Sequence, residues 1–124
     1  MTEYYYENLP EKCPPENSFT VENRIFYRLV QNDTLVESDF HSHKKIWPNK
    51  KFQVSDCIAH SLSMLEDFTS CFALTKLPAL KTRKVAAVLL TNTDGPLLQT
   101  GNNTKHYSWW RAKTFNLNGN IVTQ

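Results

Sequence analysis

The spacing of hydrophobic and polar residues divides the chain at about residue 20. Residues 1–20 are dominated by Glu, Asn and Pro, and the prolines remove backbone donors and disfavour helix. This part predicts an extended N-terminal arm, whose tyrosine triplet at 4–6 could dock it on the rest of the protein. Residues 21–124 have the apolar patterning of one folded domain, as expected for a chain of 124 residues.

Short runs of β-branched and aromatic residues predict the strands of this domain. The run at 84–91 is nearly continuously apolar, which is typical of a strand at the centre of a sheet covered on both faces. The run at 57–65 is predicted as a strand, although it could also begin a helix. A turn predicted at 92–96 returns the chain beside 84–91. Further strands are predicted at 24–31, 97–100, 106–111 and 121–122.

Two segments carry helix signals. A Thr and a Glu three residues apart have the spacing of a capping box and predict a short helix over 35–43. Two acidic residues open a second predicted helix over 66–77, and Pro78 ends it. The segment 47–51 between them is predicted to be a loop. This order of elements predicts an α+β fold, a single compact domain with a mixed or antiparallel twisted sheet and two or three short helices.

Composition narrows the function classes only a little. Three glycines are too few for a glycine-rich phosphate loop, and the net charge of +2 says nothing about partners. No apolar run spans a bilayer and the N-terminus lacks a secretory signal, so no membrane partner is expected. Cys13, Cys57 and Cys71 form no short-range pattern and are predicted to be reduced thiols, which favours a cytoplasmic location.

The densest chemistry lies at 105–111, where two tryptophans, a histidine and an arginine occur close together. On a strand, Trp109 and Trp110 point to opposite faces, so one ring can anchor the core while the other lines a groove. His106 and Ser108 would share the face of Trp110. Packing of both rings in the core is the structural alternative.

A ligand site is predicted from this cluster together with residues of earlier strands. Arg28 would hold an anionic or carbonyl group through charge-assisted hydrogen bonds, and one tryptophan would stack on a planar group. The leading hypothesis is a non-enzymatic or degenerate binding domain for an anionic or planar, nucleotide-like ligand or for a protein partner. The predicted ligand-binding residues are Arg28, Ser63, His106, Tyr107 and Trp110.

A basic loop within 41–52 is a second candidate, because lysines alternate there with histidines and aromatic rings. Such interleaving suits single-stranded nucleic acid or a phosphate-bearing ligand, so a nucleic-acid or protein interaction module is an alternative function. A solvated surface loop is the structural alternative, since charge runs usually face water. The residues concerned are Lys44, Lys45, Trp47, Lys50 and Lys51.

The sequence predicts no metal and no cofactor. His41, His43, Cys57 and His60 are suitable ligand types for zinc, but the predicted strand would turn the last two to opposite faces. Cys57 could also be a nucleophile beside His60, although an inert buried thiol is the usual state. No nucleophile elbow, phosphate-binding loop or His-Glu-x-x-His motif occurs.

Four motifs give the chain a resemblance to a family of small uncharacterised bacterial proteins, whose motifs carry no assigned function. The resemblance covers about residues 26–111. The motifs are Tyr27-Arg28-Leu29-Val30, Asp39-Phe40-x-Ser42-His43, Leu62-Ser63 before Glu66-Asp67, and His106-Tyr107-Ser108-Trp109-Trp110.

More distantly, the aromatic-Arg strand, the later strand with Ser and the β-rich second half resemble the split-sheet ADP-ribosyltransferase fold. This resemblance implies that Arg28 and either Ser61 or Ser63 would hold NAD, and that an NAD-using transferase or glycohydrolase is the alternative function. The catalytic Glu that the family carries on a late strand has no counterpart here, because no Asp or Glu follows Asp94.

Overall fold

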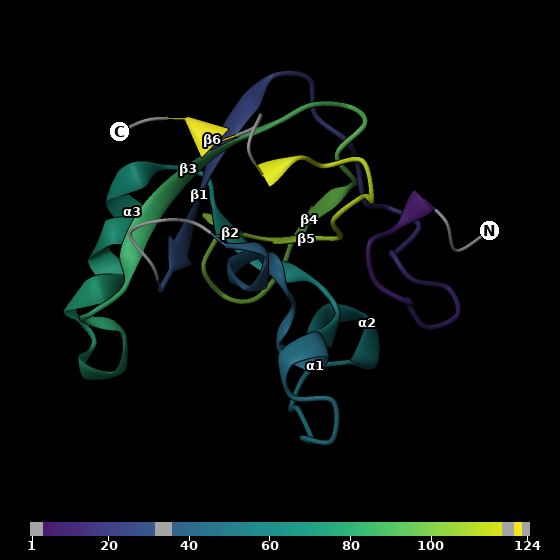
Figure 1. Cartoon of the computed structure of the whole chain (residues 1–124), viewed down its shortest axis with the longest axis horizontal. Coiled ribbons are helices and arrows are strands. Elements are labelled where there is room, and N and C mark those ends of the chain that lie inside the picture. The colour runs from purple at the N-terminus through teal and green to yellow at the C-terminus, as the bar shows by residue number, and fades with distance from the viewer. Residues whose placement is uncertain (1–3, 32–35, 118–120, 123–124) are drawn as a thin grey trace.

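The structure, a computed structural model, is built on one six-stranded antiparallel sheet with short helices around it (Figure 1). It describes residues 4–31, 36–117 and 121–122. The strands lie in the order β4-β5-β2-β1-β3-β6, and every neighbouring pair is antiparallel. The predicted α+β fold class is therefore confirmed. The strands are β1 (Arg24–Val30), β2 (Leu62–Leu65), β3 (Lys84–Leu90), β4 (Leu97–Gln99), β5 (His106–Trp109) and β6 (Ile121–Val122).

The two central strands, β1 and β2, are joined much less closely than β1 and β3. β1 pairs with β3 along its whole length, from Arg24 opposite Leu90 to Val30 opposite Lys84. β1 and β2 are in register only at Tyr27 and Leu65. The sheet is thus split at its centre, and this split later positions the candidate site.

The short strand β4 does not return beside β3 as the sequence predicts. It pairs with β5 at the opposite edge of the sheet. The turn before it is held against the end of β5, because Ala112 donates its N–H to Asp94 O and Trp110 donates to Pro96 O. Gly95 allows this close approach, since a Cβ there would lie 2.1 Å from the carbonyl oxygen of Trp110.

The helices are shorter than the sequence predicts. In place of one helix over 35–43, a 3₁₀-helix η2 (Glu37–Phe40) is followed by a separate helix α1 (His43–Ile46). Ser42 separates them because its backbone is extended and its Oγ accepts a hydrogen bond from Lys45 N, which starts α1 anew. The loop predicted at 47–51 follows α1.

The segment predicted as a strand from 57 to 65 begins as helix α2 (Asp56–Ala59) and becomes strand only at β2. The Ser55 hydroxyl oxygen accepts from Ile58 N, and this cap starts the helix. A helix start was the alternative prediction for this run.

The helix predicted over 66–77 is divided into α3 (Phe68–Ala73) and two 3₁₀-helices, η3 (Leu74–Lys76) and η4 (Pro78–Leu80). Asp67 caps α3 by accepting from Ser70 N. Cys71 is the buried residue of α3, whereas Phe68 and Phe72 are exposed.

The hydrophobic core lies on one face of the sheet, where side chains of alternating strand residues meet η2 and the segment after β5. Both Trp109 and Trp110 are fully buried, and each indole N–H donates to a backbone carbonyl, of Asp94 and Cys57 respectively. The buried cluster is formed by Phe26, Phe40, Leu62, Met64, Val88, Leu90, Leu97, Trp109, Phe115 and Leu117.

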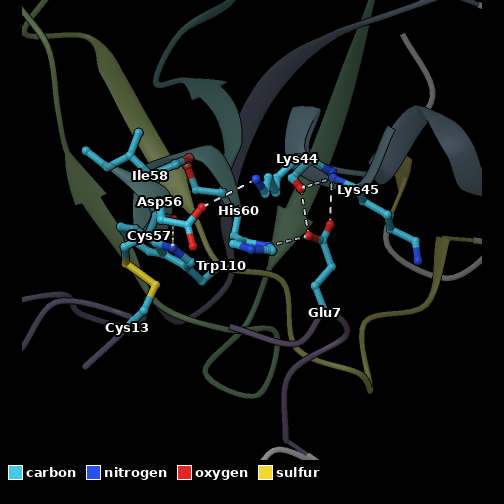
Figure 2. Close-up of polar contacts among 11 residues, drawn as sticks. Glu7, Cys13, Lys44, Lys45, Asp56, Cys57, Ile58, His60 and Trp110 are labelled. Carbon is cyan, nitrogen blue, oxygen red and sulfur yellow. Dashed lines mark hydrogen bonds and ion pairs between the residues drawn. A yellow bond between two sulfur atoms is a disulfide. The ribbon is translucent and has the colours of Figure 1, made fainter. Parts of the chain in front are cut away.

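The N-terminal arm lies against the domain at several points. Tyr5 forms a β-bridge with Ala112, and Phe19 forms one with Leu97 at the edge of the sheet. A disulfide joins Cys13 of the arm to Cys57 of α2 (Figure 2).

This disulfide corrects the prediction that the cysteines are reduced thiols. The folded arm brings two residues that are 44 positions apart in the sequence to a Cα–Cα distance of 5.5 Å, which is suitable for a disulfide. Cys71 is a free, buried thiol. The cytoplasmic location was inferred from reduced thiols and therefore loses that support. In the described residues, no helix has the length and apolar character needed to cross a bilayer.

Candidate functional site

A cavity of about 270 Å³ lies where the split sheet, α1, α2 and the loop between these helices meet. It brings together three of the five residues predicted to bind a ligand, Arg28, Ser63 and His106. The rest of the lining combines polar and apolar side chains: His41, Ser42, His43, Phe52, Val54, Ile58, Ala59, Ser61, Leu62, Thr100, Gly101 and Ser108.

The sheet register places the polar residues of β2 and β5 side by side. Ser63 lies opposite Ser108, and two residues further along Leu65 lies opposite His106. Side chains that face each other across an antiparallel pair share one face of the sheet, so Ser63, Ser108 and His106 are on the same face. The hydroxyl of Ser108 is 2.8 Å from that of Thr100, which follows β4. These strands therefore provide a row of hydroxyl groups beside an imidazole.

Arg28 lines this cavity from β1, the strand next to β2. Its Nη1 donates to the Ser63 carbonyl at 2.9 Å, and its Nε donates to the Asp39 carbonyl at 3.0 Å. Its Nη2 makes no hydrogen bond to any residue that the structure describes, and no carboxylate there forms an ion pair with Arg28. Two bonds to backbone carbonyls hold the guanidinium in place and leave donors for another group.

Burial makes the positive charge of Arg28 costly. It lowers the pKa of Arg28 to about 10, and the nearby charge of Asp39 only partly opposes this shift. Because the guanidinium is still protonated at neutral pH, the site carries a permanent, poorly solvated positive charge. An anion bound against Nη2 would compensate for the lost hydration.

Two of the three histidines that line the cavity, His43 and His106, differ in their contacts. His43 stacks on Phe52, with ring centroids 6.4 Å apart, and its imidazole makes no hydrogen bond within the described residues. Burial, followed by the charge of Arg28, lowers the pKa of His43. The Nδ1 of His106 lies 3.1 Å from the carbonyl oxygen of Thr100, which leaves its Nε2 for other contacts. Both rings can therefore offer a nitrogen to a ligand.

The charges of the lining residues are of one sign. An arginine, three histidines and five hydroxyl-bearing residues line the cavity, and no Asp or Glu is among the lining residues. Hydroxyls and imidazoles donate hydrogen bonds to anions, and a guanidinium binds carboxylate or phosphate oxygens strongly. The arrangement is suited to an acidic ligand and unsuited to a cation.

The N-terminal arm supports the cavity wall from behind. The Glu7 carboxylate accepts hydrogen bonds from Ser42 N at 2.9 Å and from Ser42 Oγ at 2.6 Å, and it lies 3.1 Å from Nδ1 of His60 (Figure 2). Tyr6 Oη is 3.0 Å from Nε2 of His41. His41 and Ser42 line the cavity, so this part of the arm fixes the position of the lining residues without contributing to the lining itself.

Helix α2 forms another part of the wall and is held on two sides. Cys57 is bonded to Cys13, and its carbonyl accepts a hydrogen bond from Trp110 Nε1 (Figure 2). The next two residues, Ile58 and Ala59, line the cavity. Lys44 of α1 lies 3.8 Å from Asp56, which links α1 to α2.

The other two predicted ligand-binding residues, Tyr107 and Trp110, are not among the residues that line this cavity. The Tyr107 ring packs against Phe26 on the core side of the sheet, because neighbouring strand residues face opposite ways. Trp110 lies beyond the end of β5, where its indole is fully buried against α2. The aromatic ring that does line the cavity is Phe52.

His43, Ser42 and Thr100 were not predicted as ligand-site residues, and Glu7 was not predicted as their support. Ser42 and His43 belong to the motif at residues 39–43, and this motif was the only sign in the sequence that pointed to them. Thr100 follows a strand in a loop of ordinary composition, and Glu7 lies in the arm. No local pattern indicates that Glu7 meets residue 42.

The basic loop lies beside the cavity. Trp47 is 58% exposed, and Lys50 lies over the ring of Phe52 at 5.7 Å. Lys45 lies over the ring of Tyr6 and Lys44 pairs with Asp56, so these two lysines take part in local contacts. Lys51 is exposed and, with Lys44 and Lys50, lines a shallow hollow next to Phe52.

Cys57 is not available for the zinc binding or nucleophilic chemistry that its residue type allows. Its sulfur is bonded to Cys13, so it is neither a thiolate ligand nor a nucleophile. His60 is engaged with Glu7. In the ranges that the structure describes, no group of three or more Cys, His, Asp or Glu side chains is arranged to hold a metal ion.

Comparison of the chain with protein-family models, with curated proteins and with solved structures finds no significant match. The resemblances given by the sequence motifs therefore stay predictions. The residues that line the cavity are therefore the basis for the function proposed below.

Proposed function

We propose that this protein is a binding domain for a small anionic ligand of the nucleotide-like class, held in the cavity at the split of the sheet. The observation that carries the proposal is the Arg28 guanidinium, whose Nη2 lacks a partner among the described residues and which lines a cavity without a lining carboxylate. A partly buried cation is stabilised when an oxyanion binds it.

The geometry supports an oxyanion better than an uncharged polar ligand. His43 stacks on Phe52 and lines the cavity together with Arg28, and it becomes a second cation when it takes up a proton. The hydroxyls of Ser63 and Ser108 lie on the same sheet face as His106. These groups would surround a phosphate-sized group with donors, while Phe52 and Val54 supply an apolar side for a planar part of the ligand.

Titration calorimetry with inorganic phosphate and with AMP tests this proposal. We expect both to bind the wild-type protein, with AMP the tighter, and we expect Arg28→Gln to weaken binding at least about tenfold because a charge-assisted bond is lost. Arg24→Gln is the matched control, since Arg24 is an exposed arginine of the same strand that lies 3.8 Å from Glu66. Equal binding by wild type and Arg28→Gln would refute the proposal.

The second candidate function is an NAD-using transferase or glycohydrolase. The observation that favours it is that Arg28, Ser61 and Ser63, the residues expected to hold NAD from the distant resemblance, line one cavity. It predicts release of nicotinamide when the protein is incubated with NAD, and loss of that release in Arg28→Gln. A concentrated sample that releases no nicotinamide would remove this candidate without affecting the binding proposal.

A further inference from the structure

A second cavity, of about 360 Å³, adjoins the first. It shares three lining residues with it, Arg28, His41 and His43. Its other lining residues include Arg83 and Trp47, together with Leu29 and Val30 of β1. The two cavities therefore meet at Arg28, His41 and His43.

Arg83 brings a second arginine side chain to this cavity. Its backbone N–H bonds to Leu80 O, but its half-buried guanidinium makes no hydrogen bond or ion pair with any residue in the described ranges. Arg83 is close enough to Arg28 and His43 for its charge to lower the pKa of both groups, after the larger effect of burial. Arg28, His43 and Arg83, which carry or can take a positive charge, therefore line two adjoining cavities.

Asp39 is the acidic residue of the second cavity, and its carboxylate is directed to the backbone. Oδ1 accepts from Gln31 N at 3.2 Å, and Oδ2 accepts from Val36 N at 3.1 Å. These bonds fix the backbone of Gln31 and of Val36, and the Asp39 carbonyl accepts a hydrogen bond from Arg28 Nε. The carboxylate has a structural role, and its charge is smaller than the combined charge of Arg28 and Arg83.

We propose that the two cavities form one elongated site for a ligand with two linked anionic groups, the first held by Arg28 and His43 and the second by Arg83. This inference rests on the proposed function and makes its ligand class more specific: a diphosphate, either free or as part of a nucleotide. Arg83 lines the second cavity and not the first, so an anion held in the first cavity leaves Arg83 without a counter-charge. The second of two linked phosphoryl groups can bind Arg83.

A free diphosphate and a nucleotide diphosphate should differ in their contact with Trp47. The indole is 58% exposed and lines the second cavity next to Ile46. A base attached to the diphosphate could stack on this ring, whereas free pyrophosphate would not use it. A comparison of pyrophosphate with ADP therefore distinguishes the two sources.

The test is titration calorimetry of the intact chain with phosphate, pyrophosphate and ADP. We expect pyrophosphate to bind wild type at least about tenfold more tightly than phosphate, since it gains charge-assisted hydrogen bonds. Arg83→Gln should remove this gain and leave phosphate affinity unchanged. Lys81→Gln, which removes an exposed charge two residues away, is the matched control and should leave the gain intact.

Each result decides the inference. If pyrophosphate binds no more tightly than phosphate, or if Arg83→Gln weakens both equally, the elongated site is refuted while the anion-binding proposal stands. If neither anion binds, both fail. A further gain with ADP that Trp47→Ala removes identifies a nucleotide, and equal affinities for ADP and pyrophosphate identify a free diphosphate; both support the shared chemistry.

Discussion

Two arginines bind consecutive backbone carbonyls in very different surroundings. Arg28 donates to Asp39 O, and Arg111 donates to Phe40 O at 3.1 Å. Arg111 also pairs with Glu37 at 2.9 Å, and its guanidinium carbon lies 3.7 Å from the centre of the Tyr6 ring. Arg28 has neither a carboxylate at ion-pair distance among the described residues nor a ring so close.

The difference indicates different roles for the two side chains. Arg111 is 5% exposed, and its contacts join η2 and the N-terminal arm to the end of the sheet. Its remaining unsatisfied donor, Nε, is buried and lines neither of the two cavities that contain Arg28. The donors of Arg28 lie instead at a cavity wall. We therefore expect Arg111 to matter for stability and Arg28 for binding.

Removal of the disulfide should have the largest effect on stability, because it releases from α2 the N-terminal arm whose Tyr6 packs on Arg111. In the chain-entropy description, a crosslink between residues 44 apart stabilises the fold by about 4 kcal/mol. The double variant Cys13→Ser, Cys57→Ser should therefore lose about that much free energy of unfolding, measured by urea denaturation. Cys71→Ser leaves the disulfide intact and serves as the comparison. A loss below about 1 kcal/mol would show that the arm is not held by the crosslink.

Substitution of the two arginines should separate their roles directly. Arg111→Ala should cost about 3 kcal/mol of unfolding free energy, because it leaves the Phe40 carbonyl without its donor and removes the contact with Tyr6. Arg28→Gln should cost about 1 kcal/mol, since an amide can keep one bond to a carbonyl. Urea titrations without ligand measure both values. Equal losses would contradict the assigned difference in role.

Glu7→Gln should have a smaller effect on stability and should also weaken anion binding, because Glu7 links the N-terminal arm to the cavity wall at Ser42. The carboxylate accepts two hydrogen bonds from Ser42, and an amide in its place keeps one acceptor oxygen. We expect a loss of about 1.5 kcal/mol in stability and a weaker affinity for phosphate, because Ser42 lines the cavity. Glu11→Gln is the control, since Glu11 is an exposed acid of the same arm. If phosphate affinity stays at the wild-type value, Glu7 does not support the site.

The pH dependence of anion binding should give the smallest effect. Burial and Arg28 lower the pKa of His43, so its imidazole is neutral at neutral pH, and a bound anion favours its protonation. Sulfate affinity should rise about threefold from pH 7.5 to about 5.5, and His43→Gln should reduce that slope. His41, whose pKa burial and Lys45 also lower, accounts for part of the remainder. A slope unchanged in His43→Gln would exclude His43.

The lowered pKa of His43 also predicts that the protein without a bound anion becomes less stable at lower pH. A lowered pKa means that the unfolded chain binds the His43 proton more tightly than the folded one. Stability should therefore fall as the pH drops through the ordinary range of a histidine, near 6.5. Sulfate should reduce this loss in thermal unfolding experiments, because it stabilises the protonated, folded form.

The sequence predicted the strands better than the helices, because the strand signals are local. The run at 84–91 and the aromatic run that begins at Arg24 each contain enough branched and aromatic residues to form a strand. The helices are short, and a single serine hydroxyl, that of Ser42 for α1 and of Ser55 for α2, decides where these two begin. Such caps are hard to distinguish from ordinary polar residues in a sequence.

The candidate site was predictable where it depends on strand alternation and unpredictable where it depends on tertiary contacts. His106 and Ser63 were selected from strands, and both line the cavity. Trp110 was assigned to the same face as His106, but it follows the end of β5, where alternation no longer applies. The Cys13–Cys57 pairing depends on how the arm folds back, which no local pattern records.

The most direct test is a nuclear magnetic resonance titration with phosphate that observes the side-chain Nε–H groups of the two arginines in one sample. We predict a progressive shift of the Arg28 signal and of the amide of Ser63, whose carbonyl binds Arg28, while the Arg111 signal stays fixed. No shift at Arg28, or equal shifts at both arginines, would contradict the assignment of Arg28 as the anion-binding group.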